Sequence, residues 1–375
     1  MDAKISLGIS SVIIILVVAS SIFYNASLGN ANNSTAGAAS NVLRIGYFPN
    51  LNHAQAVIGL ENGDFQKTLG NEGIIVEPHV FSAGPSVIEA LFANQIDVAY
   101  IGPNPAINGY VVSDGKDLRI ISGAASGGAV FVVRNDSGIK SPKDFAGKTF
   151  ASPQLGNTQD IALRKYLLDN GYKTTDNGGN VTVTPVANPD ILTLFLKKQL
   201  DGAWVPEPWG ARLVKEANGR IFLDERSIWS DGKFVTANIA ASTDYLKNNP
   251  DVIEKLLAAH VNETIWMNNH KDDAIKAFNT ELKKLTGKTI AEDELRQAWS
   301  RMDFTYDPLK ISLFQSANSA YDLGFLAKGK PRPDLSGIFD LTILDQVLKQ
   351  KGLQPVEGGG TTTSGAANNN LAAVQ

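Results

Sequence analysis

Apolar and polar positions along residues 43–241 alternate in short blocks that predict strands and helices in turn. Runs of apolar and β-branched residues end at Gly, Pro or Asn and lead into stretches with helical spacing, as in βα units. Strands are expected at 43–48, 74–81, 96–101, 118–122, 129–134, 148–151, 181–186, 202–205 and 234–241. Beyond residue 249 the pattern becomes helical, with helices from 250 and at 271–285, 291–301 and 339–351. This alternation predicts an α/β fold whose sheets are mostly parallel and flanked by helices.

An internal repeat divides this pattern into two similar halves. PSVIEALFANQIDVAYI (85–101) and PDILTLFLKKQLDGAWV (189–205) share Pro, Gln, Asp and Ala at equivalent positions, 189 − 85 = 104 residues apart. The same offset places RIGYFPNLNHAQ (44–55) over KTFASPQLGNTQ (148–159). Any two βα units look alike to some degree, but one offset that holds across two windows favours a true duplication. We therefore expect two lobes with a ligand cleft between them.

The helical last third of the chain is expected to return to the first lobe, because the second half already has its own strands and helices. Lobe 1 is predicted to comprise residues 42–125 and 234–352, and lobe 2 residues 126–233, with the chain crossing near 123–128 and 230–236. The remaining segments are expected to be a signal peptide or membrane anchor at 1–24, a flexible linker at 25–41 and a disordered tail at 353–375.

The N-terminal prediction rests on charge and length. Residues 5–24 carry no charge, and twenty residues of helix span about 30 Å, the thickness of the hydrocarbon core of a bilayer. Lys4 precedes this stretch and no charge follows it until Arg44, which favours an extracytoplasmic body. Whether the segment is cleaved or stays as an anchor is left open.

Composition excludes several classes of function. The 375 residues carry a net charge of −4 and no cysteine, so a nucleic-acid partner, disulfides, thiolate metal sites and cysteine nucleophiles are not expected. No metalloprotease, phosphate-loop or serine-hydrolase motif occurs in the sequence. We expect a binding protein rather than an enzyme, without a cofactor or a metal ion.

Candidate ligand-binding residues follow from the rule that open α/β sheets bind ligands beyond the carboxyl ends of their strands. The turns there are polar or rich in glycine, and several lead directly into helices, whose first N–H groups favour anions. The candidates are Asn50, Asn52, His53, Ser82, Ala83, Gly84, Gly102, Pro103, Asn104, Gly156, Asn157, Thr158, Gln159, Glu207 and Trp209. No Lys or Arg lies in these turns, so an anion would depend on backbone N–H groups and helix dipoles.

Two of these residues are also candidates for selectivity, because the two copies of the repeat diverge just after the shared part. Glu207 either pairs with a ligand ammonium group or protein donors, or accepts hydrogen bonds from nearby helix amides. Trp209 either forms an apolar wall of the site or packs in the core. Tyr100 and His260 are expected to be packing residues.

Five ordered motifs resemble one known family. They are GYFPNLNHA (46–54), SAGP (82–85), IDVAYIGPNPA (96–106), SPKDFAGKTFASPQLGNTQD (141–160) and DGAWVPEPW (201–209). Together they are similar to substrate-binding proteins of ABC importers of the nitrate, sulfonate and taurine type, which include binders of thiamine-pyrimidine precursors. The resemblance covers about residues 42–350. It implies a two-lobed fold like that of type II periplasmic binding proteins, and it adds Ser126, Gly127 and Gly128, at the entry to the hinge strand, to the candidates.

The function implied by this resemblance is capture of a small oxyanion, such as an aliphatic sulfonate, taurine or nitrate. The partners implied are the small-molecule ligand, an ABC permease and its cytoplasmic ATPase. The protein would act as a monomer outside the cytoplasm, secreted or anchored to the membrane by an uncleaved N-terminal segment. The alternatives are a binder of a thiamine or pyrimidine-like precursor and a ligand-sensing domain for a membrane receptor.

Overall fold

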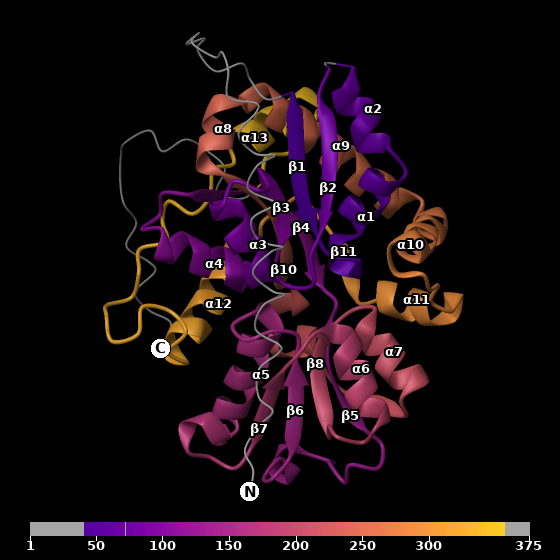
Figure 1. Cartoon of the computed structure of the whole chain (residues 1–375), viewed down its shortest axis with the longest axis vertical. Helices are drawn as coiled ribbons and strands as arrows, with labels where there is room; N and C mark the ends of the chain where they lie inside the picture. Colours follow the sequence, from indigo (N-terminus) through magenta and orange to yellow (C-terminus); the bar gives the residue numbers. More distant parts are fainter. Residues whose placement is uncertain (1–40, 72, 357–375) are drawn as a thin grey trace, which may run out of the picture. The chain divides into compact units, whose positions relative to one another are not determined.

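The computed structural model describes residues 41–71 and 73–356, so the predicted signal or anchor, most of the linker and most of the tail lie outside the described residues. Two sheets organise this part of the chain (Figure 1). The first sheet has the order β11 (Met302–Phe304), β4 (Leu118–Gly127), β10 (Val235–Ser242), β3 (Val98–Ile101), β1 (Val42–Tyr47) and β2 (Ile75–Val80). The second has the order β7 (Thr182–Pro185), β6 (Thr149–Ser152), β8 (Gly202–Pro206), β5 (Ala129–Arg134) and β9 (Gly219–Asp224). We call the parts built on them the first and second lobes.

Both sheets are mixed rather than mostly parallel. In the first, β1 pairs in parallel with β2 and β3, whereas β10 is antiparallel to β3 and β4. In the second, β6 is parallel to β7 and β8, whereas β5 is antiparallel to β8 and β9. The antiparallel strands include those that carry the chain between the lobes. Strand β4 was expected to end at residue 122 but continues to Gly127 and leads almost directly into β5, so the chain passes from the first sheet to the second here.

Helices cover both faces of each sheet. They are α1 (Ala54–Glu61), α2 (Asp64–Gly70), α3 (Gly84–Phe92), α4 (Pro103–Val112), α5 (Thr158–Asp169), α6 (Asn188–Leu196), α7 (Trp209–Glu216), α8 (Thr243–Asn248), α9 (Pro250–Asn269), α10 (Lys271–Thr286), α11 (Glu292–Trp299), α12 (Lys310–Asp322) and α13 (Thr342–Gln350). Short 3₁₀ helices are η1 (Leu51–His53), η2 (Pro142–Asp144), η3 (Thr175–Asn177), η4 (Glu225–Ile228) and η5 (Ser230–Gly232).

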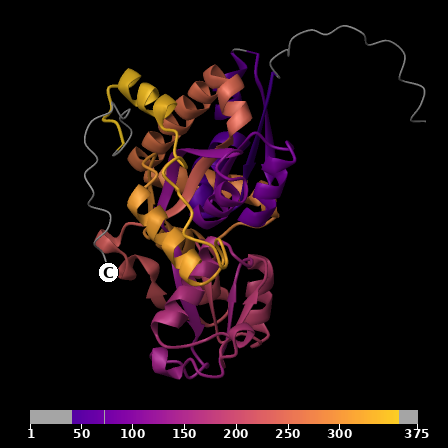
Figure 2. The ribbon, with the colours of Figure 1, turned by 90° about the vertical axis from the view of Figure 1, so that its left-hand side faces the viewer.

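The alternation of side chains along the strands divides the core between these helices. On β3, Val98 and Tyr100 pack in the cluster that contains α1, α9, α10 and α13, while Ala99 and Ile101 pack with α3, α4 and α12. On β5, Phe131 packs toward α5 and Val130 toward α6 and α7. The helices that follow residue 243 therefore belong to the first lobe, and Figure 2 shows α12 and α13 on one side of it.

The structure confirms the internal repeat. Helices α3 and α6 begin 188 − 84 = 104 residues apart and end at the same offset. Both helices are followed by one residue with positive φ, 53° at Asn94 and 59° at Lys198. The offset also relates an ion pair of Arg44 with Asp97 to a looser one of Lys148 with Asp201. Because element bounds, backbone conformation and pairing coincide, the two lobes share one βαβ design.

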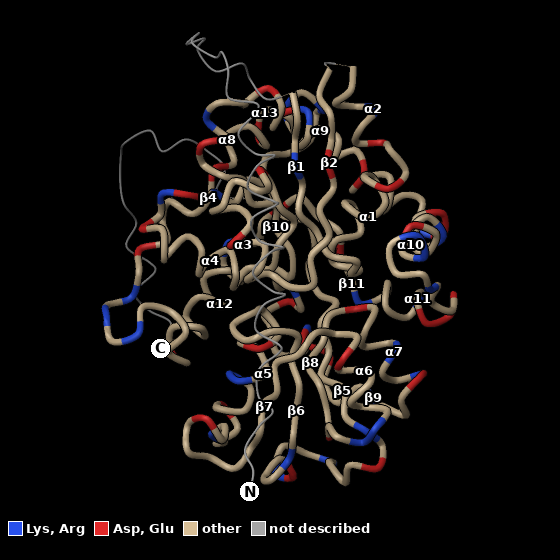
Figure 3. Tube along the Cα trace, viewed as in Figure 1, with Lys and Arg blue, Asp and Glu red and all other residues tan. Residues whose placement is uncertain are grey.

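Charged residues of both signs are distributed over the outer helices of the described residues (Figure 3). Figure 3 shows Lys and Arg mixed with Asp and Glu over the outer helices, for example α10 and α11. Among the helices of residues 41–71 and 73–356, none is both long and apolar enough to cross a bilayer.

Candidate ligand-binding site

A small cavity lies between the two lobes. Its lining comes from the segments that follow β1, β2 and β3 in the first lobe, from β10, and from the segments around β6, α6 and β8 in the second. The lining residues are Phe48, Asn50, Asn52, His53, Ser82, Ala83, Gly84, Gly102, Pro105, Pro153, Asn157, Thr158, Gln159, Asn188, Pro206 and Thr236. The space open to the centre of a water-sized sphere is about 20 Å³, enough for about one water molecule. The lobes are therefore closed over the site.

Four helices begin at this cavity, and each places residues of its N-terminal end in the lining. They are α3, α4, α5 and α6, of nine, ten, twelve and nine residues. The N-cap residues of α3, α4 and α6 are Ala83, Gly102 and Ala187, and none makes a side-chain cap hydrogen bond. The positive ends of these helix dipoles thus lie at a cavity whose lining includes no Lys, Arg, Asp or Glu, while the prolines in the first turns of α3, α4 and α6 leave only a few backbone N–H groups there. This environment suits an anion that brings several acceptor oxygens.

Several buried polar atoms in the lining have no hydrogen-bond partner among the described residues. They are Asn52 Oδ1, both ring nitrogens of His53, Thr158 Oγ1 and Asn188 Oδ1. The orientation of Asn52 is fixed, because its Nδ2 donates to the Thr236 carbonyl oxygen over 3.1 Å and leaves Oδ1 as a free acceptor. A buried polar group without a partner costs about 1–3 kcal/mol. Their gathering around one cavity makes it a candidate binding site, in which a bound molecule or water would supply the missing partners.

His53 lies at the centre of this group. The residue is fully buried, and its ring lies 4.4 Å from that of Phe48 and 6.4 Å from that of Tyr100, centroid to centroid. Burial lowers the pKa of His53 to about 3, so the ligand-free imidazole is neutral at physiological pH. A neutral imidazole offers one donor and one acceptor to a ligand.

Direct contacts join the lobes around the cavity. Trp209 Nε1 in the second lobe donates to Asn50 Oδ1 in the first over 3.0 Å, and the Leu51 amide donates to the Glu207 carbonyl oxygen over 2.9 Å. Gly102 approaches Thr158 so closely that a Cβ atom at Gly102 would lie 2.4 Å from Thr158 Oγ1. These contacts depend on closure and hold the polar atoms in place.

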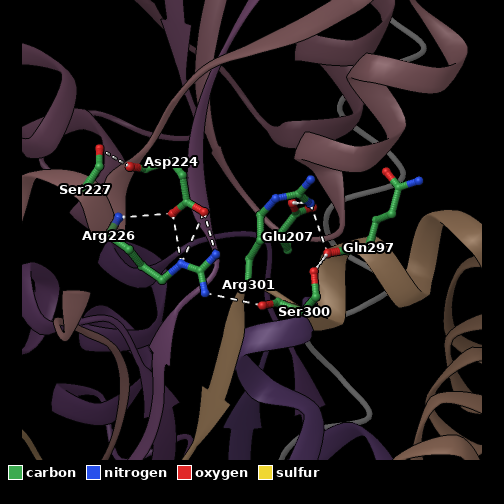
Figure 4. A network of polar contacts seen from close by, with 7 residues as sticks. All are labelled: Glu207, Asp224, Arg226, Ser227, Gln297, Ser300 and Arg301. Carbon is green, nitrogen blue, oxygen red and sulfur yellow. Dashed lines mark hydrogen bonds and ion pairs between the residues drawn. The ribbon is translucent and has the colours of Figure 1, made fainter. Parts of the chain in front are cut away.

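Glu207 makes its contacts with protein groups and lies outside the cavity lining. Its fully buried carboxylate accepts from Arg301 Nη1 over 2.7 Å and from the Ala211 amide over 2.9 Å (Figure 4). Burial raises its pKa, whereas Arg301 opposes that shift. Arg301 belongs to the first lobe, so the ion pair bridges the lobes, and the nearby Arg226 adds a hydrogen bond to the Ser300 carbonyl oxygen. Of the alternatives left open for Glu207, these contacts favour the one in which protein donors and a helix amide engage the carboxylate.

The predicted site residues fall into two groups. Those in the cavity lining are Asn50, Asn52, His53, Ser82, Ala83, Gly84, Gly102, Asn157, Thr158 and Gln159. Those outside it are Pro103, Asn104, Ser126, Gly127, Gly128, Gly156, Glu207 and Trp209.

The residues outside the lining have other structural roles. Asn104 donates to the Ser316 carbonyl oxygen, and the Gly156 amide donates to Asp160 at the start of α5. Residues 126–128 form the crossing between the lobes, where the Ser126 hydroxyl accepts from the Phe234 amide. The ring of Trp209 packs against the guanidinium group of Arg212, whose Cζ atom lies 4.7 Å from the ring centroid.

Six lining residues were not predicted: Phe48, Pro105, Pro153, Asn188, Pro206 and Thr236. The repeat could have identified Asn188, because it occupies the position equivalent to Gly84 (188 − 84 = 104). Nothing in the local sequence marks Thr236, which reaches the cavity on the returning strand β10. As for metal ions, residues 41–71 and 73–356 hold no group of three or more Asp, Glu or His side chains arranged to bind one.

Two lobes closed over a small polar cavity that faces helix N-termini define a solute-binding protein of the two-lobed class. The chain belongs to the NMT1-like family, whose sequence model matches residues 36–280. A protein of Brucella abortus (strain 2308) named as a binding protein is 24% identical over 263 residues, which cover 68% of this chain and 78% of that protein.

More distant relatives carry names that state a ligand. The taurine-binding periplasmic protein of Escherichia coli (strain K12) is 22% identical over 182 residues, which cover 48% of this chain and 54% of that protein. The alkanesulfonate-binding protein SsuA of Xanthomonas axonopodis pv. citri, solved bound to MOPS, has the same fold with a TM-score of 0.65 at 18% identity, and the match covers 78% of this chain and 96% of SsuA.

Proposed function

We propose that this protein is the extracytoplasmic solute-binding component of an ABC importer and that it captures a small oxyanion, in the first place taurine or another aliphatic sulfonate. The observation that carries the proposal is the closed cavity between the lobes, with four helix N-termini and a set of unpartnered buried polar atoms. The names of the taurine-binding and alkanesulfonate-binding relatives support the same ligand class.

The sulfonate or nitrate group would occupy the side of the cavity formed by the helix starts. Each oxygen of such a group accepts hydrogen bonds, and the free N–H groups at the starts of α3 and α6 are donors without competing side-chain caps. The hydroxyl of Thr158 adds a donor from α5. The lining holds no Lys or Arg, so these hydrogen bonds and the helix dipoles would take the place of such a cation.

The unpartnered acceptors favour a ligand that also carries a donor. Asn52 Oδ1 and Asn188 Oδ1 would remain unsatisfied against a bare oxyanion such as nitrate. An ammonium group would satisfy them and gain charge-assisted hydrogen bonds. Among the oxyanions considered, taurine combines a sulfonate with an ammonium group, and we rank it above nitrate for this reason.

Capture requires the lobes to open, since the cavity described here has room for about one water molecule, and a bound ligand would hold the closed lobes slightly further apart. A ligand that contacts both lobes shifts the population toward the closed form by its differential affinity for that form. The closed form would then be recognised by a permease that works with a cytoplasmic ATPase. The uncharged apolar stretch at residues 5–24 and the periplasmic taurine-binding relative support a position outside the cytoplasm, secreted or anchored.

Thermal unfolding of the full chain with a panel of ligands tests this proposal. The panel contains taurine, ethanesulfonate, nitrate, bicarbonate and an aminopyrimidine, each well above its expected Kd. A ligand at 100 times its Kd stabilises the folded state by about 2.7 kcal/mol, which raises Tm measurably. We expect the largest shift with taurine. A shift with the aminopyrimidine alone would identify a pyrimidine-precursor binder instead, and no shift with any member would contradict the proposal.

A further inference from the structure

His53 is the one side chain in the cavity lining that can gain a charge near neutral pH. The other lining residues are amides, hydroxyls, glycines, prolines, one alanine and one phenylalanine. Whether the site carries a positive charge therefore depends on a single imidazole.

The surroundings of His53 leave both of its ring nitrogens free for a ligand. Neither nitrogen has a hydrogen-bond partner within the described part of the chain, although the residue is fully buried. Two aromatic rings, Phe48 and Tyr100, lie against the imidazole. The hydrogen bond made by one ring nitrogen of a histidine determines which nitrogen carries the proton, and no described residue makes such a bond to His53.

The titratable groups on the elements packed around η1 are engaged elsewhere. The Tyr100 hydroxyl on β3 is hydrogen-bonded to His260 Nδ1 over 2.9 Å, and His260 Nε2 contacts the Gly123 carbonyl oxygen over 2.9 Å. Glu207, directly after β8, is paired with Arg301, directly before β11. The remaining groups are Tyr47 on β1, hydrogen-bonded to Glu61 on α1, Glu263 on α9 and Asp303 on β11, and none of them has a hydrogen bond to His53.

We propose that His53 takes up one proton from solvent when an oxyanion enters the cavity, so that anion binding and protonation of this imidazole are coupled. The proton forms an N–H bond at the unprotonated ring nitrogen, and the resulting imidazolium offsets the ligand's negative charge inside the closed site. This inference rests on the proposed function, and it makes His53 the residue that discriminates ligands with an oxyanion group from solutes without one.

Linkage between the two events fixes the pH dependence. Burial lowers the pKa of His53 to about 3 in the ligand-free protein, and a neighbouring anion raises this pKa in the complex. Between those two pKa values the complex holds one proton more than the free protein and ligand. Anion affinity therefore falls as pH rises, by up to tenfold for each pH unit, whereas affinity for a ligand without an oxyanion group stays constant.

Isothermal titration calorimetry on the full chain tests this coupling. Ethanesulfonate and taurine are titrated from pH 5.5 to 8 in buffers of different ionisation enthalpy, which yields the number of protons taken up per bound anion. We expect an uptake close to one proton at the acidic end and an affinity that falls with pH. His53→Gln should abolish both the uptake and the pH slope, whereas His270→Gln, at an exposed position, should leave both unchanged.

Histidine ¹⁵N NMR of the wild-type protein with and without ethanesulfonate detects protonation of the imidazole directly and needs no variant. One imidazole should become protonated on binding at pH 6. Binding without proton uptake, or uptake that persists in His53→Gln, would overturn the inference while leaving the proposed function intact. Failure of every anion to bind at any pH would instead refute the proposed function and this inference with it.

Discussion

The ion pair between Glu207 and Arg301 provides the sharpest mutational test of how the lobes close. The carboxylate, at the end of β8 in the second lobe, is fully buried, and Arg301 reaches it from the first lobe over 2.7 Å. Arg301→Met keeps the aliphatic bulk of the side chain but removes the charge. In the closed form this variant leaves Glu207 with the Ala211 amide as its remaining donor among the described residues.

The expected cost follows from the burial of the pair. Removing one partner of a buried ion pair costs about 3–5 kcal/mol. The Arg301 side chain is 16% exposed, and opening of the lobes would let Glu207 regain water, so we expect about 2–3 kcal/mol against the closed form. This corresponds to a Kd for the ligand that is roughly 30 to 150 times weaker.

The pH dependence of Arg301→Met has a definite sign. Burial already raises the pKa of Glu207, and loss of Arg301 removes the main influence that lowers it. A carboxyl group whose pKa is higher in the folded than in the unfolded state destabilises the fold as pH rises. The closed form of Arg301→Met should therefore be destabilised, relative to the wild type, more at pH 8 than at pH 5.

Small-angle scattering of the ligand-free chain and titration with taurine measure the effect. We expect Arg301→Met to have a larger radius of gyration than the wild type and weaker binding. The double variant Glu207→Gln with Arg301→Met removes the buried charge and should recover most of the affinity. The reasoning is refuted if the single variant binds as tightly as the wild type, or if the two substitutions are additive in the double variant.

Three further predictions concern other residues. Burial raises the pKa of Glu225 to about 7, so its contribution to the free energy of unfolding should fall by about 3 kcal/mol between pH 4.5 and 7, where the folded state holds the extra proton. Urea denaturation across that range checks this: Glu225→Gln should lose that part of the slope and keep the part due to Glu263, whose pKa burial also raises to about 7. Thr158→Val removes an unpartnered buried hydroxyl, so Tm should rise or stay unchanged while taurine binds at least about tenfold more weakly, a loss of about 1.4 kcal/mol; a lower Tm with unchanged binding would argue against a ligand contact. Gly102→Ala places a Cβ atom 2.4 Å from the Thr158 hydroxyl and should hold the lobes apart in scattering, and Thr158→Ala in the same chain should restore closure.

Much of the architecture could be predicted because it is encoded locally. The repeat located the two equivalent helices and the strands after them, since apolar spacing and turn residues act over a few positions. The sequence pattern did not predict β11, in the segment that returns to the first lobe, or the extension of β4 through Gly127. Small residues such as Gly123, Ala124 and Ala125 carry little strand propensity, and pairing with β10 and β11 determines their conformation.

The candidate site was predictable where it follows strand ends and not where it depends on distant pairing. Asn52, His53 and Thr158 lie in turns that the sheet rule selects. Glu207 also lies at a strand end, but its partner Arg301 is 94 positions away in sequence. Sequence alone does not show that this arginine reaches across the lobes, so it left open whether the carboxylate meets a ligand or protein donors.

The central claim is that the cavity between the lobes binds a small oxyanion through helix N-termini and the unpartnered polar side chains. Titration calorimetry of the full chain with taurine at pH 6, in parallel with Thr158→Val and Asn188→Ala, tests it most directly. The account predicts one bound taurine per chain and at least about tenfold weaker binding in each variant. Absence of binding to the wild type, or equal affinity in all three proteins, would contradict it.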